Sequence, residues 1–323
     1  MTRLAFLIVG FVVFSATPVV LRAVRAATPR WRARLAFVSL VGLGLTTSAL
    51  LAAVLLPGAL TASGLGSALR MCSHVVSAFG RRPLARTPSI VAGIALGLVL
   101  GRFGWSLVSS VRINRRTAVH GLEPRWHVAG RTPVYVVATA RPLAFSFGWV
   151  RRQVVVSEGL LGGLDQDERR AVLLHEEGHV RAGHHRTLLL ARSVAAALRP
   201  LPSATANLGA LEQAMEECAD DYAAARIGDR AVVASSLSKA ALAGLKAPAG
   251  ALALGTDRTI AERVTRLLDE RGGRARATVA CLVALGALVG LLAGTQAVAA
   301  VALAAAAHHV VVMGAASACP LKR

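Results

Sequence analysis

The sequence predicts a mainly α-helical membrane protein, with about four transmembrane helices and one soluble α+β domain that contains a small sheet. Two observations carry this prediction. The chain is 54% hydrophobic, with a mean hydropathy of +0.56, whereas soluble domains are about 45–50% apolar. The apolar residues are also concentrated in a few long runs, which flank a region of ordinary polarity between residues 112 and 277.

Three apolar runs contain no charged residue: Leu4–Leu21, Leu35–Leu56 and Thr278–Ala307. Each is long enough to cross a hydrocarbon core of about 30 Å as a helix. A fourth run, Ser89–Val111, is interrupted by Arg102 alone. The first run could instead be a cleaved signal peptide, but no clear A-x-A cleavage site follows it.

These runs divide the chain into three parts. Residues 1–111 form an N-terminal membrane region with spans at about 4–21, 35–56 and 89–111. Residues 112–277 form a folded domain, which is long enough to build its own core. Residues 278–323 form a C-terminal transmembrane helix and a short tail.

The chain is strongly basic, with a formal net charge of +20. A basic chain can bind nucleic acid, but here the arginines cluster beside the apolar runs, as in the loop 22–34. Flanking arginines set membrane topology and contact anionic headgroups, so we expect the lipid bilayer as a partner and no nucleic acid. The rule that positive loops face inward places the 22–34 loop, and with it the domain, on the cytoplasmic side of the cell membrane. Arg81, Arg82 and Arg86 oppose this orientation, because it places their positive charge outside. The loops and domain flanks that it places in the cytoplasm still contain more arginines than those outside.

Local patterns indicate the elements of the domain. Segments 120–140 and 152–157 contain β-branched runs typical of strands. Asp165 and Glu168 have the spacing of a capping box, which predicts a helix from about Gln166 to Leu198 that ends before Pro200. Further helices are expected over about 208–227, ended by Gly228, and over about 232–245 and 259–270.

The first of these helices contains the pattern His175-Glu176-x-x-His179. Residues four apart lie on one face of a helix, so both imidazoles can bind a single zinc ion. Glu176 then lies beside the metal and can act as a general base toward a water molecule. The motif therefore predicts a Zn²⁺ site with Glu176 as its catalytic residue.

A catalytic zinc needs three protein ligands and one open position. His185 occupies the place of the third histidine in the pattern H-E-x-x-H-x-x-G-x-x-H, but the glycine of that pattern is displaced here to Gly183. In a continued helix, His185 lies about 9 Å along the axis from His179, which is out of reach. The spacing therefore disfavours His185 as the third ligand.

The alternative third ligand is a carboxylate from the helix expected at 208–227. Glu216 is the candidate, and Asp220 lies one turn later, where it can orient a ligating histidine through the free ring nitrogen. Glu217 and Asp221 have the same spacing, so spacing leaves both registers open. In isolation, these four acids would be interpreted as a solvated helix face.

Three segments carry a resemblance to a known group of enzymes. They are Val154–Leu161, the zinc-helix segment Ala171–His179, and the pattern Glu216-x-x-Ala219-Asp220-x-x-Ala223. Together they resemble the BlaR/MecR-type membrane metallopeptidases, and they are similar to the HtpX-like heat-shock proteases and CAAX prenyl proteases. The resemblance implies a zincin-like fold, and its E-x-x-A-D pattern selects Glu216 over Glu217. It covers about residues 134–268 and the flanking spans.

The chain departs from the β-lactam receptors, because it ends shortly after the last apolar run and shows no penicillin-binding sensor domain. Ser236-x-x-Lys239 fits one sensor motif, but no S-D-N or K-T-G follows. The resemblance therefore implies an integral membrane zinc metalloendopeptidase that acts on protein or peptide substrates, without antibiotic sensing. The alternative is a non-catalytic membrane sensor or scaffold, whose structural zinc would need a fourth protein ligand such as His184.

One further residue has two interpretations. The segment 257–264 resembles a family stretch that ends in an arginine. Arg263 is a possible transition-state stabiliser, and the competing interpretation is a structural ion pair with an acid such as Glu262 or Glu216.

Overall fold

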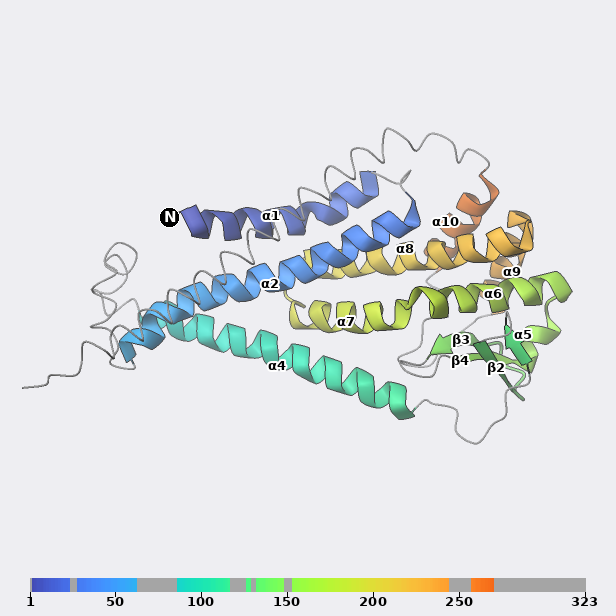
Figure 1. The fold of residues 1–323 in the computed structure, drawn as a ribbon, viewed down its shortest axis with the longest axis horizontal. Helices are drawn as coiled ribbons and strands as arrows, with labels where there is room; N and C mark the ends of the chain where they lie inside the picture. Colours follow the sequence, from blue (N-terminus) through green and yellow to red (C-terminus); the bar gives the residue numbers. More distant parts are fainter. Residues whose placement is uncertain are drawn as a thin grey trace, which may run out of the picture.

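The computed structural model of the chain is an elongated molecule with its long apolar helices at one end and a small sheet at the other (Figure 1). Helices make up most of the residues that it describes, which confirms the mainly helical prediction. The described residues are 2–23, 28–62, 86–116, 126–128, 132–147, 153–243 and 257–269.

Within the described residues, three helices form the apolar end: α1 (Thr2–Ala23), α2 (Pro29–Ala62) and α4 (Arg86–Arg116). Two segments within them are long and apolar enough to cross a membrane, Pro29–Leu55 and Thr87–Ile113, and α1 contributes a shorter apolar segment, Leu7–Leu21. The two long segments coincide with two of the four expected spans. The count of four is not confirmed, because the expected span at 278–307 lies outside the described residues.

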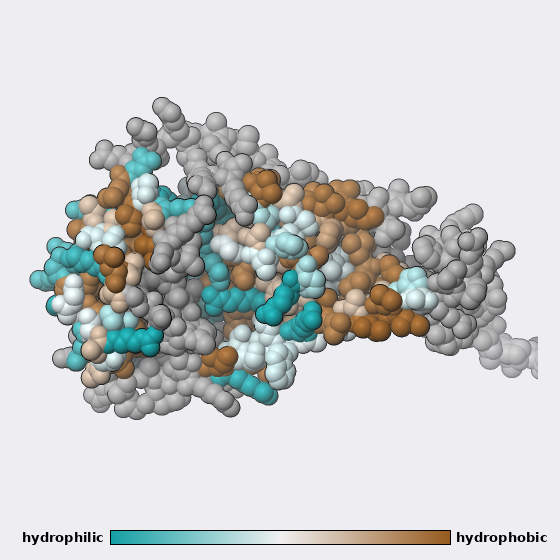
Figure 2. Space-filling model, turned by 180° about the vertical axis from the view of Figure 1, so that it is seen from behind, coloured by the Kyte–Doolittle hydropathy of each residue, from teal (hydrophilic) through white to brown (hydrophobic). Residues whose placement is uncertain are grey.

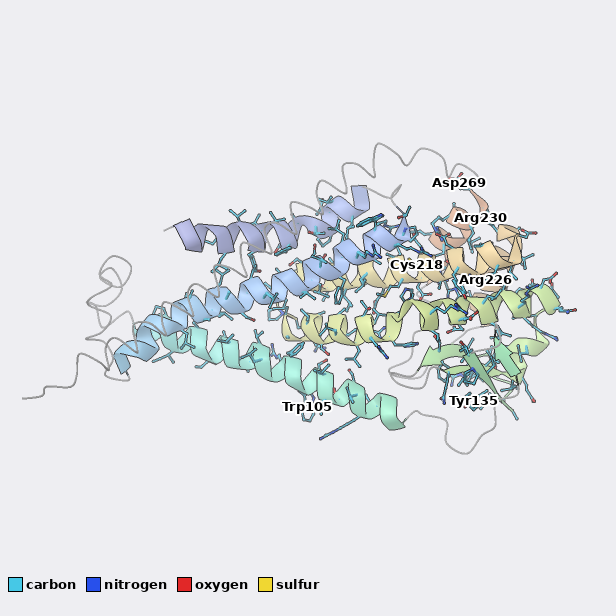
Figure 3. The ribbon with its side chains drawn as sticks, in the orientation of Figure 1. Trp105, Tyr135, Cys218, Arg226, Arg230 and Asp269 are labelled. Atoms are coloured by element: carbon cyan, nitrogen blue, oxygen red, sulfur yellow. The ribbon has the colours of Figure 1, made fainter. Side chains whose placement is uncertain are left out.

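The helix α4 exposes large apolar side chains that a soluble protein would bury. Ile90, Ile94 and Leu98 are all more than half exposed, and Trp105 is 76% exposed. Trp105 points away from the neighbouring helices (Figure 3). In the space-filling view, hydrophobic residues gather over the end of the molecule that holds the long helices (Figure 2). An exposed apolar surface of this kind fits contact with lipid.

The zinc-motif helix is shorter than the sequence predicts. The helix α6 (Gln166–Ala182) stops at Gly183, whose φ of 68° lies in the left-handed region, and α7 (His184–Ala197) starts directly after it. The prediction of one helix through Leu198 was therefore wrong, because a glycine in this conformation ends a helix without a Cβ penalty. The predicted capping box at the start of α6 is confirmed, with Asp165 and Glu168 bonded to each other's backbone N–H groups.

A helical hairpin links the domain to the apolar end. It consists of α7 and α8 (Pro202–Ile227), and it lies beside α2 and α4 (Figure 1). Leu188, Leu198 and Leu211 of the hairpin share one buried cluster with Phe14 of α1 and Leu40 of α2. The helix α8 ends at Gly228, with a φ of 81°, as the sequence predicts. Its start at Pro202 is earlier than expected.

The sheet contains four strands in the order β1-β2-β4-β3. The strands are β1 (Trp126–Val128), β2 (Thr132–Val137), β3 (Ala144–Phe147) and β4 (Gln153–Ser157). The central pair β2 and β4 is parallel, and the two outer pairings are antiparallel. The sequence did not predict β3, because it is short and lies between the turn residues Arg141-Pro142 and Gly148. Its position at the edge of the sheet matters for the site below.

Two close contacts fix the turn that leads from β4 to the zinc-motif helix. Ser157 accepts hydrogen bonds from the backbone N–H groups of Leu160 and Leu143, and it caps the short helix α5 (Glu158–Gly162). A Cβ atom on Gly159 would lie 2.0 Å from the carbonyl oxygen of Ala140, so only glycine fits there. These contacts account for the Ser157-Glu158-Gly159-Leu160 segment of the sequence.

Two helices complete the described domain, α9 (Arg230–Leu242) and α10 (Asp257–Leu268). Both lie within about three residues of their predicted bounds. They pack against each other and against α8, so α10 covers the face of α8 that carries the acidic residues.

Candidate metal centre

The two motif histidines lie side by side on the buried face of α6. The Nε2 atoms of His175 and His179 are 3.1 Å apart, and both side chains are buried. Gly178 lets α8 approach this face, because a Cβ there would lie only 3.1 Å from the Cα of Ala219. The small residues Gly178 and Ala219 thus bring the two helices close enough for an α8 side chain to reach the histidines.

Glu216 is the α8 side chain that reaches them. Its Oε2 lies 3.6 Å from Nε2 of His175, and its Oε1 lies 3.5 Å from Nε2 of His179. Among the described residues, these three form the group of buried side chains that could hold a metal ion. The structure therefore brings Glu216, and not Glu217, to the histidine pair.

This donor set fits zinc. Two ligands of a tetrahedral zinc, with bonds of about 2.0–2.1 Å, lie about 3.3 Å apart, which is close to the separations of the three side chains. Oε2 of Glu216 is buried and makes no hydrogen bond, although Nη1 of Arg263 lies 3.0 Å away in an ion pair. A buried carboxylate oxygen without a hydrogen bond, facing two imidazole nitrogens, is suited to a cation.

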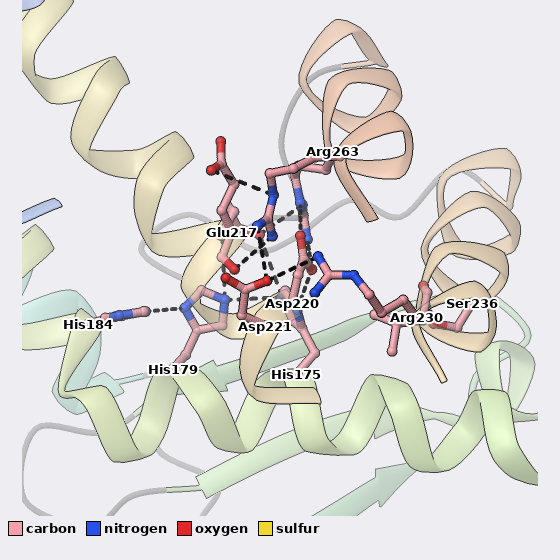
Figure 4. Close-up of polar contacts among 12 residues, drawn as sticks. His175, His179, His184, Glu217, Asp220, Asp221, Arg230, Ser236 and Arg263 are labelled. Carbon is pink, nitrogen blue, oxygen red and sulfur yellow. Dashed lines mark hydrogen bonds and ion pairs between the residues drawn. The ribbon is translucent and has the colours of Figure 1, made fainter. Parts of the chain in front are cut away.

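Both imidazole rings are also held at their other nitrogen (Figure 4). Nδ1 of His175 lies 3.0 Å from Oδ1 of Asp220, and Nδ1 of His179 lies 2.8 Å from Nδ1 of His184. Burial lowers the pKa of His184 to about 4, so its neutral ring can accept a hydrogen bond from His179. Such contacts fix the tautomer that leaves both Nε2 atoms available for a metal.

The carboxylates of Asp220 and Glu216 favour a positive charge on the imidazole of His175. Burial alone would lower the pKa of His175, but hydrogen bonds to Asp220 and Glu216 outweigh it and raise the pKa to about 9. Burial and the charge of His175 hold the pKa of His179 well below its usual value. The acids therefore favour a positive charge on His175, in addition to the guanidinium of Arg263 that pairs with both of them.

Arg263 is directed at the acids of the site. It is almost fully buried, its Nε and Nη2 atoms donate to the two oxygens of Asp220 at 2.8 and 2.6 Å, and its Nη1 pairs with Glu216. This is the ion-pair arrangement that the sequence offered as the alternative, with Glu216 as one partner. The role of Arg263 as a transition-state stabiliser stays a prediction.

Glu176 lies on the same helix and borders a small cavity. The cavity has a volume of about 20 Å³ and is lined by Glu176, His175, Asp220, Ser236 and apolar residues of α6 and α9. This is enough for about one water molecule. Burial raises the pKa of Glu176 to about 6, against the opposing effects of His175 and of hydrogen bonds from Ser146, and its Oε2 has no hydrogen-bond partner.

Sequence reasoning missed two residues that support these groups, Ser146 and Arg32, and it considered His184 as a possible fourth ligand. Ser146 of β3 contacts Glu176, and its hydroxyl lies 3.1 Å from Nε2 of His185. His184 supports His179, and Arg32 of α2 donates to Glu217 at 2.7 Å. His185 is therefore engaged with the sheet and not with the metal group. Ser146 and Arg32 had no signal in the sequence, because each reaches its partner only through the tertiary fold.

The part of the chain that carries this site is similar to known proteins. Residues 116–259 match the family described as Peptidase family M48. Similar proteins include Protease HtpX of Hahella chejuensis, 51% identical over 53 residues, which are 16% of this chain and 18% of that protein. Protease HtpX of Nitrosococcus oceani is 43% identical over 67 residues, 20% of this chain and 23% of the relative. Protease HtpX of a Psychrobacter species is 44% identical over 63 residues, 19% of this chain and 21% of the relative.

The aligned part is thus about a fifth of the length of these relatives. No solved structure matches the chain. The family match and the relatives support the HtpX-like side of the resemblance, an M48-type membrane metallopeptidase, and they add nothing specific to the BlaR/MecR branch.

Proposed function

We propose that this chain, whose residues 116–259 match peptidase family M48, is an integral membrane zinc metalloendopeptidase that hydrolyses peptide bonds of protein substrates. One observation carries the proposal. His175, His179 and Glu216 converge from two helices into a buried donor set, and Glu176 lies next to it with a carboxylate oxygen that has no hydrogen bond.

The residues have separate roles in this reaction. His175, His179 and Glu216 would hold the zinc, which when bound supplies a Lewis acid and lowers the pKa of water to about 7. Glu176 accepts the proton of the attacking water and then donates it to the leaving amine. Asp220 orients His175, and Arg263 holds Asp220 and Glu216 in place.

The strand β3 offers a place for the substrate. It is an end strand of the sheet, paired with β4 on one side, and α6 packs against it. An extended peptide can add to such an edge through backbone hydrogen bonds, which gives loose sequence specificity. Ser146 on this strand contacts Glu176, so a peptide along β3 would pass close to the base.

Membrane attachment follows from α2 and α4, whose apolar surfaces fit lipid. The contact between Arg32 and Glu217 lies at the start of α2, so this end of the span and the domain belong on one side of the membrane. The arginine-rich loop before α2 favours the cytoplasmic side of the cell membrane. A membrane protease with a cytoplasmic site suits two tasks, cleavage of a regulator such as a repressor and removal of damaged membrane proteins.

The competing proposal, a structural zinc in a sensor or scaffold, requires a fourth protein ligand. His184 was the candidate, but its ring contacts Nδ1 of His179, on the far side of that ring from the Nε2 atom that faces Glu216. Among the described residues, the metal group has three members. Three ligands leave one position open, as a catalytic site requires.

Glu176→Gln tests the proposal in the purified full-length chain, with an unfolded protein such as casein as substrate. The amide keeps the shape of the side chain and cannot accept the proton, so the cleavage rate should fall by a factor of about 10²–10⁴ while bound zinc is unchanged. Asp167→Gln, at an exposed acid in the first turn of α6, is the control and should cleave normally. Retention of activity by Glu176→Gln would remove the mechanism.

A further inference from the structure

The helix α8 carries two acid pairs with identical spacing. Glu216 and Asp220 form one pair, and Glu217 and Asp221 form the other. Neighbouring residues on a helix point about 100° apart around the axis. A rotation of α8 by one residue would therefore present the second pair to the histidines, and the spacing of the acids does not distinguish the two registers.

In the structure, arginines from three other helices engage the second pair. Nη2 of Arg230, at the start of α9, lies 3.4 Å from Oδ1 of Asp221. Nη1 of Arg32, in the first turns of α2, donates to Oε2 of Glu217 at 2.7 Å, and both side chains are buried. Arg266 of α10 donates to the backbone oxygen of Glu217 and to Oδ1 of Asp221, each at 3.0 Å. The second pair is thus held on the side of α8 that faces α2 and α10.

We propose that Arg32 is a positioning residue for the metal site, because its ion pair with Glu217 selects the rotation of α8 that presents Glu216 to His175 and His179. This inference rests on the proposed zinc site. Arg32 reaches Glu217 from a candidate membrane span, 185 residues away in sequence. The span therefore helps to set the zinc affinity of the domain through a residue that is not a metal ligand.

The ion pair between Arg32 and Glu217 can fix the rotation of α8 because both side chains are buried. A long exposed ion pair exchanges freely with water and fixes little, whereas Arg32 and Glu217 are shielded and joined by a short charge-assisted bond. The bulk of the interface between α2 and α8 is apolar, so it offers few directional polar contacts besides this ion pair. A buried polar pair in an apolar interface is a known means of fixing register.

The test measures the zinc dissociation constant of the purified full-length chain by competition with a chelator, together with helical content and thermal unfolding. Arg32→Met removes the contact and leaves buried Glu217 with only the longer ion pair to Nε of Arg266, 3.6 Å from its Oε2, so this variant is also expected to be less stable. The double variant Arg32→Met/Glu217→Met removes both charges with side chains of similar length, which commonly preserves the fold. Arg32→Lys keeps the charge, and Arg34→Met is the matched control, because Arg34 is exposed and lies over Trp31.

We expect the double variant to fold like the wild type and to bind zinc at least about tenfold more weakly, as other residues that orient metal ligands do. Arg32→Lys should lie between the wild type and Arg32→Met, and Arg34→Met should match the wild type. A folded double variant that binds zinc as tightly as the wild type would overturn the positioning role and leave the zinc site intact. A wild-type chain that binds no zinc would overturn the proposed function as well, so the two failures are distinguishable.

Discussion

The histidines of the site are oriented by two different kinds of partner. Asp220 holds His175, and Asp220 is itself fixed by the two donors of Arg263. His179 is held by the neutral ring of His184. Burial alone would raise the pKa of Asp220, but Arg263 and His175 outweigh it and lower the pKa below its usual value. Asp220 therefore stays ionised and can accept the N–H of His175.

Asp220→Asn tests this support at the level of one residue. The amide loses the negative charge that stabilises both His175 and Arg263, so the zinc affinity should fall by about 10- to 100-fold. Chelator competition on the purified chain measures the change. Asp229→Asn is the control, because Asp229 is an exposed helix cap away from the site. Equal zinc affinity in Asp220→Asn and the wild type would show that the aspartate does not act on the ligand.

At the level of the elements, Glu168 joins the start of α6 to α9. It completes the capping box with Asp165 and also accepts hydrogen bonds from Ser235 and Lys239, at 2.7 Å each. Burial alone would raise the pKa of Glu168, but the bonds from Lys239, Ser235 and the backbone of Asp165 outweigh it and lower the pKa from 4.5 to about 2. The helix that carries the histidines is thus anchored at its first turn.

This link predicts a pH dependence of stability. Because the folded pKa of Glu168 lies below the unfolded value, its stabilisation is complete above about pH 4.5 and is lost as the pH falls toward 2. The loss is at most about 3 kcal/mol, since water screens the half-exposed Lys239. Urea unfolding of the chain in detergent, followed by circular dichroism between pH 2 and 6, measures it.

Lys239→Met should flatten this dependence, because it removes the strongest donor to Glu168. Arg170→Met, at an exposed position of α6, should keep the wild-type dependence. An unchanged pH profile in Lys239→Met would assign the stabilisation to other groups.

The sequence predicted those elements that short-range signals define. Asp165 and Glu168 marked the start of α6, Gly228 marked the end of α8, and the β-branched runs marked β2 and β4. The strand β3 was missed because four residues between turns carry little signal of their own. The break at Gly183 was missed because the residues around it favour a helix, and only the left-handed conformation of the glycine ends it.

The residues of the candidate site also divide into those that local patterns predicted and those that they did not. The spacing of His175 and His179 follows from one helix, and the choice of Glu216 came from the resemblance, since spacing left Glu217 open. Arg32, 185 residues from its partner, and Ser146, on an unpredicted strand, depend on tertiary contacts. Such contacts leave no periodicity or local motif in a sequence.

For the whole molecule, the packing of the α7–α8 hairpin against α2 and α4 makes the apolar helices and the domain one body. The metal site lies near the end of the hairpin where α2 starts, since Arg32 contacts the residue next to Glu216. With α2 in the membrane, the site would lie close to the bilayer surface.

The proposed orientation predicts which residues are reachable from outside the cell. In a chain whose native cysteines are replaced by alanine, Asp167→Cys should react with a membrane-impermeant maleimide only after the cells are opened. Ser77→Cys lies between the second and third expected spans, a loop that this orientation places outside, so it should react in intact cells. Labelling of Asp167→Cys in intact cells would reverse the topology and leave the metal centre unaffected.

The central claim is that two histidines and one glutamate bind zinc and leave one position open. Zinc K-edge absorption on the purified Glu176→Gln chain measures this most directly, because the variant keeps the metal and does not turn over. The account predicts one zinc with two imidazole nitrogens at about 2.0–2.1 Å, a carboxylate oxygen and one further oxygen from water, and the loss of this signal in Glu216→Gln. A zinc bound by four protein ligands, or an unchanged spectrum in Glu216→Gln, would contradict it.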